Sequence, residues 1–291
     1  MPISFTKISR NISVIFMIII GLASWQAAAD DLSITPYIPN ILSINYGIDS
    51  DEGRNTFLYT NLNLKPRHRL SLGVGSQDET VTRSEEELDS NTYLVGYSYY
   101  KHQGLQVGAE YENWGEKDKI TTDTYSVFIS FSVDMLSVSI SPQYRDITVY
   151  TESQCSGNID SNALKIDLDL YPADSWSVSA SYTSYDYSKN RSRLLGCVDQ
   201  SELFLIVARL QTVAYDYQSA IGFEYYQDTE TYGIQWSQAE SAIDASITHG
   251  MYTYVSSDAL DDWSITFTLG RQENFDKSTT DFLQGALTYY W

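Results

Sequence analysis

Histidine, cysteine and basic residues are all scarce in this sequence of 291 residues. It has 3 His and 2 Cys, and 38 Asp and Glu outnumber 18 Lys and Arg, which gives a formal net charge of −20. None of the three His (His68, His102 and His249) lies in a recognisable hydrolase motif with Ser or Asp. The acidic runs lack the D-x-D-x-D-G spacing of a calcium loop. We therefore predict no enzyme activity, no catalytic residues, no cofactor, no metal site and no nucleic-acid partner.

Long apolar runs are absent after the N-terminus, and so is helical periodicity of any length. The apolar stretch at 14–23 spans only about ten residues, whereas a transmembrane helix needs roughly 20. Lys7 and Arg10 precede this stretch and small residues follow it at 27–29, which is the layout of a secretory signal peptide. We predict that residues 1–29 are cleaved; an uncleaved N-terminal anchor is the alternative. Any membrane crossing must then be made by strands. Strands cross only as a closed barrel, because lipid offers no hydrogen-bond partner to the N–H and C=O groups at the open edge of a sheet.

In place of helical periodicity, apolar and polar residues alternate along most of the chain. In residues 121–133, for example, one face of an extended strand would carry Tyr125, Val127, Ile129, Phe131 and Val133, and the other would carry Thr124, Ser126, Ser130 and Ser132. Successive side chains of a strand point to opposite faces, so this pattern predicts half-buried strands. From residue 55 onward there are fourteen such windows, at 55–65, 69–77, 91–100, 104–114, 121–133, 136–146, 162–171, 175–187, 201–211, 214–227, 230–238, 242–254, 262–270 and 281–291.

The last window alternates up to the final residue. Leu283, Leu287, Tyr289 and Trp291 share one face of the predicted strand. An amphipathic last strand that ends on an aromatic residue resembles the end of Gram-negative outer-membrane β-barrel proteins, a resemblance that covers about ten residues and marks no subfamily. It implies that these four residues form a barrel-assembly signal, that the barrel-assembly machinery is a partner, and that the protein resides in the cell outer membrane.

Alternation alone leaves two all-β architectures open. In a soluble sandwich the apolar faces would pack against a second sheet, whereas in a membrane barrel they would face lipid. Windows of about 10–13 residues match tilted membrane strands better than soluble strands of about five or six. Many of the 24 Tyr and 6 Trp gather near window ends, where an aromatic girdle would lie. We therefore predict an all-β fold, a transmembrane antiparallel up-and-down β-barrel of about 14 strands.

The strand count depends on how the N-terminal segment is interpreted. Bacterial single-chain barrels have even strand numbers, and twelve or sixteen are the alternatives to fourteen. We assign 55–291 to the barrel and 30–54 to an N-terminal segment that is a candidate first strand. Short turns should be periplasmic and the long, acidic loops extracellular. That orientation requires a strand before residue 55, but Pro36 and Pro39 argue against it; if it exists, one late window must merge or be lost.

The two cysteines fall in predicted loops at the same end of the barrel. Cys155 lies in the segment 147–161 and Cys197 in the segment 188–200. The periplasm is oxidising, and a pair of Cys in an exported protein usually forms a disulfide. We predict a disulfide between them that ties the two loops together; two free thiols are the alternative.

Charged residues opposite the apolar faces are candidates for lining a lumen: Glu110, Glu112, Lys165, Asp167 and Asp169. The first functional hypothesis is a porin-like channel for small hydrophilic or cationic solutes, in which these charges tune selectivity and the excess of carboxylates favours cations. Internal salt bridges that plug a narrow barrel are the alternative role for the same charges.

Two further functional hypotheses remain open. One is a non-conducting structural barrel whose acidic loops bind a polysaccharide or a protein partner, and the other is an outer-membrane barrel enzyme. Expected contacts are with outer-membrane lipid and with lipopolysaccharide, the latter through divalent cations. The alternative role of the acidic loops is to keep the protein soluble during export.

Overall fold

The computed structural model of this chain describes residues 39–81, 86–102, 104–150, 156–188, 210, 213–260, 262–274 and 277–291. The predicted signal peptide and both cysteines lie outside these residues, so the cleavage and the disulfide stay predictions. Within the described part of the chain, no helix is long and apolar enough to cross a membrane.

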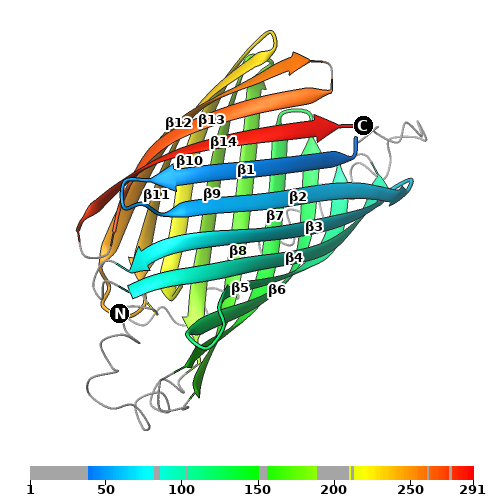
Figure 1. The fold of residues 1–291 in the computed structure, drawn as a ribbon. Helices are drawn as coiled ribbons and strands as arrows, with labels where there is room; N and C mark the ends of the chain where they lie inside the picture. Colours follow the sequence, from blue (N-terminus) through cyan, green and yellow to red (C-terminus); the bar gives the residue numbers. More distant parts are fainter. Residues whose placement is uncertain are drawn as a thin grey trace. The chain divides into compact units, whose positions relative to one another are not determined.

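Fourteen antiparallel strands form one closed barrel, with each strand beside its neighbours in sequence (Figure 1). The strands are β1 (Ile41–Asp49), β2 (Arg54–Lys65), β3 (His68–Val81), β4 (Glu86–His102), β5 (Leu105–Glu116), β6 (Ile120–Val133), β7 (Leu136–Tyr150), β8 (Ser156–Ala173), β9 (Trp176–Tyr187), β10 (Tyr215–Gln227), β11 (Glu230–Ser241), β12 (Ile247–Leu260), β13 (Trp263–Glu273) and β14 (Thr279–Tyr290). The predicted all-β barrel of fourteen strands is therefore confirmed.

The first and last strands close the barrel. β1 and β14 pair without a register shift from Ile41 opposite Tyr290 to Asp49 opposite Phe282. One step beyond the strands, the backbone N–H of Asn40 donates to the carbonyl of Trp291 over 3.0 Å, and that of Trp291 donates back over 3.2 Å. Closure removes the unpaired edges that lipid would leave unsatisfied.

The fourteen strands are not the fourteen predicted windows. β1 exists, because both prolines precede its first residue, Ile41, and interrupt no ladder. The window 201–211 contributes no strand to the barrel, because β9 pairs directly with β10. Of that window only Leu210 is described, and it has helical backbone geometry. A strand before residue 55 thus exists, and one late window is lost, so the number of strands stays at fourteen.

The two faces of the sheet differ in chemistry. Outward-facing side chains are apolar and exposed on most strands, as at Val127 and Phe267, which are 56% and 57% exposed. Inward-facing positions carry mainly Ser, Thr, Asn, Gln and Gly. Exposure of this many large apolar side chains is unfavourable in water, so the apolar face is one that contacts lipid.

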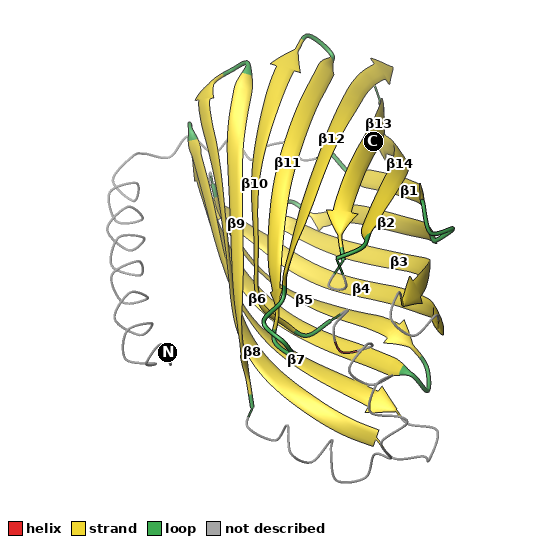
Figure 2. Cartoon of the chain, turned by 90° about the vertical axis from the view of Figure 1, so that its left-hand side faces the viewer, coloured by secondary structure: helices red, strands yellow, loops and turns green. Residues whose placement is uncertain are grey.

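The connections define two ends of the barrel. At what we call the turn end, six hairpins leave only two residues between strands. At the other, the loop end, most connections are three to five residues long, and the exception is 188–214 between β9 and β10. Strands β3 and β4 extend beyond their predicted windows, so the connection between them shrinks to residues 82–85. Figure 2 shows the strands running between these two sets of connections.

Candidate functional site

The inner face of the barrel is the candidate site, and it includes all five predicted lumen charges. Glu110 and Glu112 occupy inward positions of β5, alternating with the outward Val107 and Ala109. Lys165, Asp167 and Asp169 occupy inward positions of β8. Their common orientation follows from the two-residue period of a strand, and their role in selectivity stays a prediction.

Two further inward charges, Arg145 and Glu224, were not singled out from the sequence. The guanidinium of Arg145 lies 5.0 Å from the ring centroid of Tyr185, and its Nη1 donates to the carbonyl of Val213 over 3.2 Å. Glu224 accepts hydrogen bonds from the hydroxyls of Ser177, Tyr226 and Tyr254, the first over 3.1 Å. Tyr144 and Phe223, which directly precede Arg145 and Glu224 in the sequence, lie on the outward face. Because successive residues of a strand point to opposite faces, this alternation places Arg145 and Glu224 on the inward face.

These charges form a track that crosses the inner wall from the loop end to the turn end. Near the loop end, Glu112 interacts electrostatically with Arg145. Farther along, Glu110 lies within reach of Lys165, whose Nζ is 3.3 Å from Asp167 Oδ2. The track continues to the turn end, where Asp169 interacts electrostatically with Asp167 and Glu224.

We call the inward face of β5–β10 the charged sector. Between the strand ends it carries five carboxylates and two cations: Glu110, Glu112, Asp167, Asp169, Glu224, Arg145 and Lys165. The sector therefore carries three more carboxylates than cations.

The rest of the inner wall, on β11–β14 and β1–β4, is the neutral sector. In the middle of these strands the inward positions carry uncharged residues: Ser43, Asn45, Phe57, Tyr59, Asn61, Ser71, Gly73, Gly75, Leu94, Gly96, Ser98, Gly233, Gln235, Ser237, Gly250, Tyr252, Tyr254, Thr266, Thr268, Gly270, Phe282, Gln284 and Ala286. Arg69, the second residue of β3, also faces inward, near the turn end, and its guanidinium donates to the carbonyl of Pro39 over 3.3 Å. Short hydroxyl contacts tie neighbouring strands together here, such as the 3.0 Å contact between Ser43 and Thr288.

Inward aromatic rings lie flat on the wall because glycine faces them. Phe57, Phe128, Tyr254 and Phe282 each stand directly across the strand pair from a glycine, Gly75, Gly108, Gly233 and Gly270 respectively. A Cβ at Gly233 or Gly270 would overlap the ring of its partner. The missing side chain therefore lets each ring fold against the sheet and leaves the lumen wider than the residue sizes suggest.

A short segment of the long β9–β10 connection packs inside the mouth at the loop end. Leu210, Val213 and Ala214 are buried in one apolar cluster with inward side chains of three strands, Ile120, Ile147, Val149 and Ile159. The hydrogen bond from Arg145 fixes the same segment. Leu210 belongs to the window 201–211, so its apolar character serves packing within the mouth rather than a strand. The segment narrows the mouth over β6–β8.

The predicted assembly residues lie on the outward face of β14 and just beyond it. Leu283, Leu287 and Trp291 are between 39% and 44% exposed. The ring of Tyr289 stacks on Trp291 with centroids 5.6 Å apart and contacts Trp263 at 4.6 Å. Their role in assembly stays a prediction. The described residues contain no group of three or more His, Cys, Asp or Glu that could hold a metal ion.

Comparisons with known proteins place the fold. No family model and no curated protein matches the sequence. Among solved structures, the CymD monoaromatic hydrocarbon channel is 10% identical with a TM-score of 0.55, over 88% of this chain and 89% of that one. A bacterial polysaccharide outer membrane secretin is 8% identical with a TM-score of 0.52, over 87% and 98%. The KdgM porin is 11% identical with a TM-score of 0.47, over 86% and 99%.

At these identities the likenesses show the fold alone. The chain has the fold of porin-like outer-membrane β-barrels. Its apolar outward face and closed sheet are those of a protein of the cell outer membrane.

Proposed function

We propose that this protein is a porin-like channel of the cell outer membrane that passes small hydrophilic solutes and prefers cations. The observation that carries the proposal is the charged track of the inner wall, with five carboxylates against two cations. A sequence that needed only a structural barrel has no physical reason to line it with a surplus of like charge, since like charges at close range repel.

The ion pairs within the track support a pore rather than a plug. Only Lys165 and Asp167 form an ion pair within 4.0 Å, and their side chains remain 42% and 31% exposed. Glu224 is held by three hydroxyl groups instead of by a cation. A carboxylate fixed by neutral donors keeps its charge facing the lumen, where it attracts mobile cations.

The neutral sector supports the same function from the other side. Its hydroxyl and amide groups wet the wall without holding a charged solute in place. Conduction requires sites that attract a solute and still release it, and a wall that is charged on one side and uncharged along the middle of the other meets both needs.

A conductance experiment tests this proposal. Purified, folded protein in a planar bilayer with a KCl gradient is expected to show discrete conductance steps and a reversal potential of the sign that K⁺ preference gives. The absence of ion flux would contradict the channel. A reversal potential of zero or of the opposite sign would contradict the cation preference alone.

A second candidate is a non-conducting barrel that binds a polysaccharide or a protein partner at its loop end. The observation that favours it is the apolar cluster around Leu210 and Val213, which occupies part of the mouth. Folded protein without ion flux would favour this function. Lipid hydrolysis or acyl transfer by the same preparation would instead favour an enzyme, which is not part of our proposal.

Outer-membrane lipid and lipopolysaccharide are the proposed partners of the outer surface, with divalent cations bridging acidic residues near the loop end to anionic headgroups. The barrel-assembly machinery is the proposed partner during insertion.

A further inference from the structure

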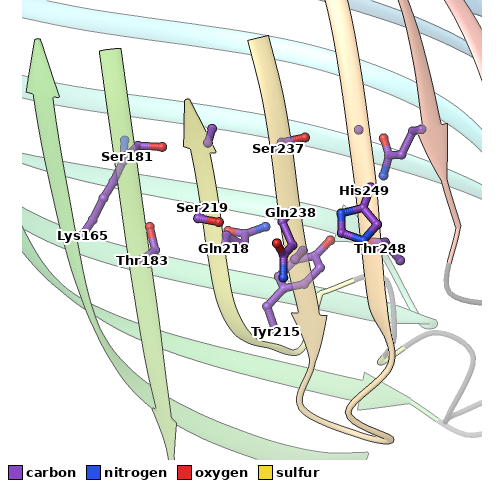
Figure 3. Close-up of a pocket in the computed structure, with 14 residues that line it drawn as sticks. Lys165, Ser181, Thr183, Tyr215, Gln218, Ser219, Ser237, Gln238, Thr248 and His249 are labelled. Carbon is purple, nitrogen blue, oxygen red and sulfur yellow. The ribbon is translucent and has the colours of Figure 1, made fainter. Parts of the chain in front are cut away.

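A recess of about 270 Å³ opens in the inner wall across β8–β13 (Figure 3). At the share of volume that water takes in the liquid, this space holds roughly nine water molecules. It is slightly smaller than the roughly 300–1,000 Å³ of pockets that take drug-sized ligands. The recess therefore suits one small solute.

The recess exists because small side chains meet across four strands. Ser181 on β9 stands opposite Ala220 on β10, which stands opposite Ser237 on β11, which in turn stands opposite Gly250 on β12. A residue with a larger side chain at any of these positions would fill the hollow. The row is set by strand register between positions far apart in sequence, so it is invisible in the sequence pattern of any one strand.

Polar groups without an internal partner surround the hollow. No other side chain or backbone group within the described ranges hydrogen-bonds the side chains of Ser181, Thr183, Ser237, Thr248 and Gln272, which all line the recess. Gln218 accepts a hydrogen bond at Oε1 from the hydroxyl of Tyr185 over 2.9 Å. That bond orients the amide and leaves its Nε2 to donate to a ligand.

The single cation of the lining does not make the recess an anion site. The Nζ of Lys165 is already 3.3 Å from Asp167 Oδ2, and Glu110 also lies within electrostatic reach. An incoming carboxylate would meet two carboxylates that compete for the same ammonium group. The local balance of charge thus disfavours an anionic ligand and leaves hydroxyl and amide groups as the recognition chemistry.

We propose that this recess is a binding site for a neutral, polyhydroxylated solute of monosaccharide size. Its hydroxyl groups pair with the Ser, Thr and Gln side chains, which both donate and accept. The aromatic ring of Tyr215 at the border offers an apolar surface for a sugar ring. This inference rests on the proposed function, because the pore is the route by which the solute reaches the recess.

The test compares three proteins with one probe, D-glucose. Wild-type channels in a planar bilayer are titrated with D-glucose, and ion conductance is expected to fall with a saturable component. In Ala220→Leu the leucine side chain fills the recess, so the apparent affinity is expected to fall by about tenfold or more, which corresponds to 1.4 kcal/mol. Ala286→Leu is the matched control, because Ala286 is inward on β14 and borders no part of the recess.

Two more measurements keep the result decisive. Thr248→Val removes one hydroxyl at nearly constant size, so it is expected to weaken the glucose effect even if Ala220→Leu fails to fold. Saturation-transfer NMR in detergent measures glucose binding without ion flux. Binding without conductance would keep the site and contradict the channel. Conductance with no saturable glucose effect, or an effect that Ala220→Leu and Thr248→Val leave unchanged, would overturn the site. If D-glucuronate binds more tightly than D-glucose, the neutral ligand class is wrong.

Discussion

The charged and neutral sectors are built on the same sheet and differ only in their inward residues. Both have apolar outward positions, both are built from antiparallel strand pairs, and both contribute to one closed barrel. Yet β5–β10 direct five carboxylates and two cations into the lumen, while the central inward positions of β11–β14 and β1–β4 have none. The fold constrains the outward positions through lipid, and this leaves the inward positions free to determine selectivity.

Destabilising the β1–β14 seam, which lies in the neutral sector, should have the largest effect, because neither sector exists unless the barrel closes. In Trp291→Asp, a charge replaces an outward aromatic that stacks on Tyr289 next to the β1–β14 seam. A charge on a lipid face costs up to about 2–4 kcal/mol, depending on depth. We expect at least about a tenfold loss of folded barrel, measured as heat-modifiable migration on gels, since 1.4 kcal/mol is a factor of ten. Trp291→Phe should assemble normally, and normal yield of Trp291→Asp would contradict the predicted assembly role.

Releasing the segment that contains Leu210 and Val213 from the mouth should have the next largest effect. It should also increase the surplus of negative charge in the charged sector. Arg145→Ala removes the hydrogen bond to the Val213 carbonyl and the contact with the Tyr185 ring. It also removes one of two cations from the charged sector. We expect a larger and noisier conductance together with a stronger preference for K⁺. Arg145→Lys is the control: it keeps the charge, so only the conductance should change, and an unchanged conductance in both variants would show that the segment does not narrow the pore.

Adding bulk to the neutral sector should have the smallest effect. In Gly270→Leu, the new side chain displaces the Phe282 ring from the wall into the lumen. We expect conductance to fall by less than about twofold, with the K⁺/Cl⁻ ratio unchanged because no charge has moved. The matched variant Gly285→Leu adds the same side chain on the outward face, where a Cβ at Gly285 would make only ordinary van der Waals contact with the Phe267 ring. Equal conductance in both variants would mean that the rings do not shape the pore.

The sequence predicts the repeated parts of this structure and misses its singular ones. The two-residue period is local, so thirteen of the fourteen strands and the inward direction of Glu110, Glu112, Lys165, Asp167 and Asp169 follow from counting along each strand. The total of fourteen is right because β1 replaces the window 201–211. The order of the strands follows too, since an up-and-down barrel pairs each strand with its neighbours.

The missed features depend on contacts between distant segments. Leu210 alternates like a strand residue, but its apolar partners are Ile147 and Ile159 inside the mouth. The recess exists only because the register brings Ala220 beside Ser181 and Ser237. The two prolines that argue against β1 in the sequence precede its first residue, Ile41, and the ends of elements are the part of a sequence pattern that is hardest to predict.

The most direct test of the account is the K⁺/Cl⁻ permeability ratio of a barrel whose charged sector has lost its five carboxylates, through Glu110→Gln, Glu112→Gln, Asp167→Asn, Asp169→Asn and Glu224→Gln. The control neutralises five outward carboxylates, Asp123, Asp146, Asp160, Glu230 and Glu240, in the same way. We predict that the inward variant loses its cation preference or turns to anions, because Arg145 and Lys165 remain, while the outward variant keeps the wild-type ratio. A wild-type ratio in the inward variant would contradict the claim that the charged sector sets selectivity.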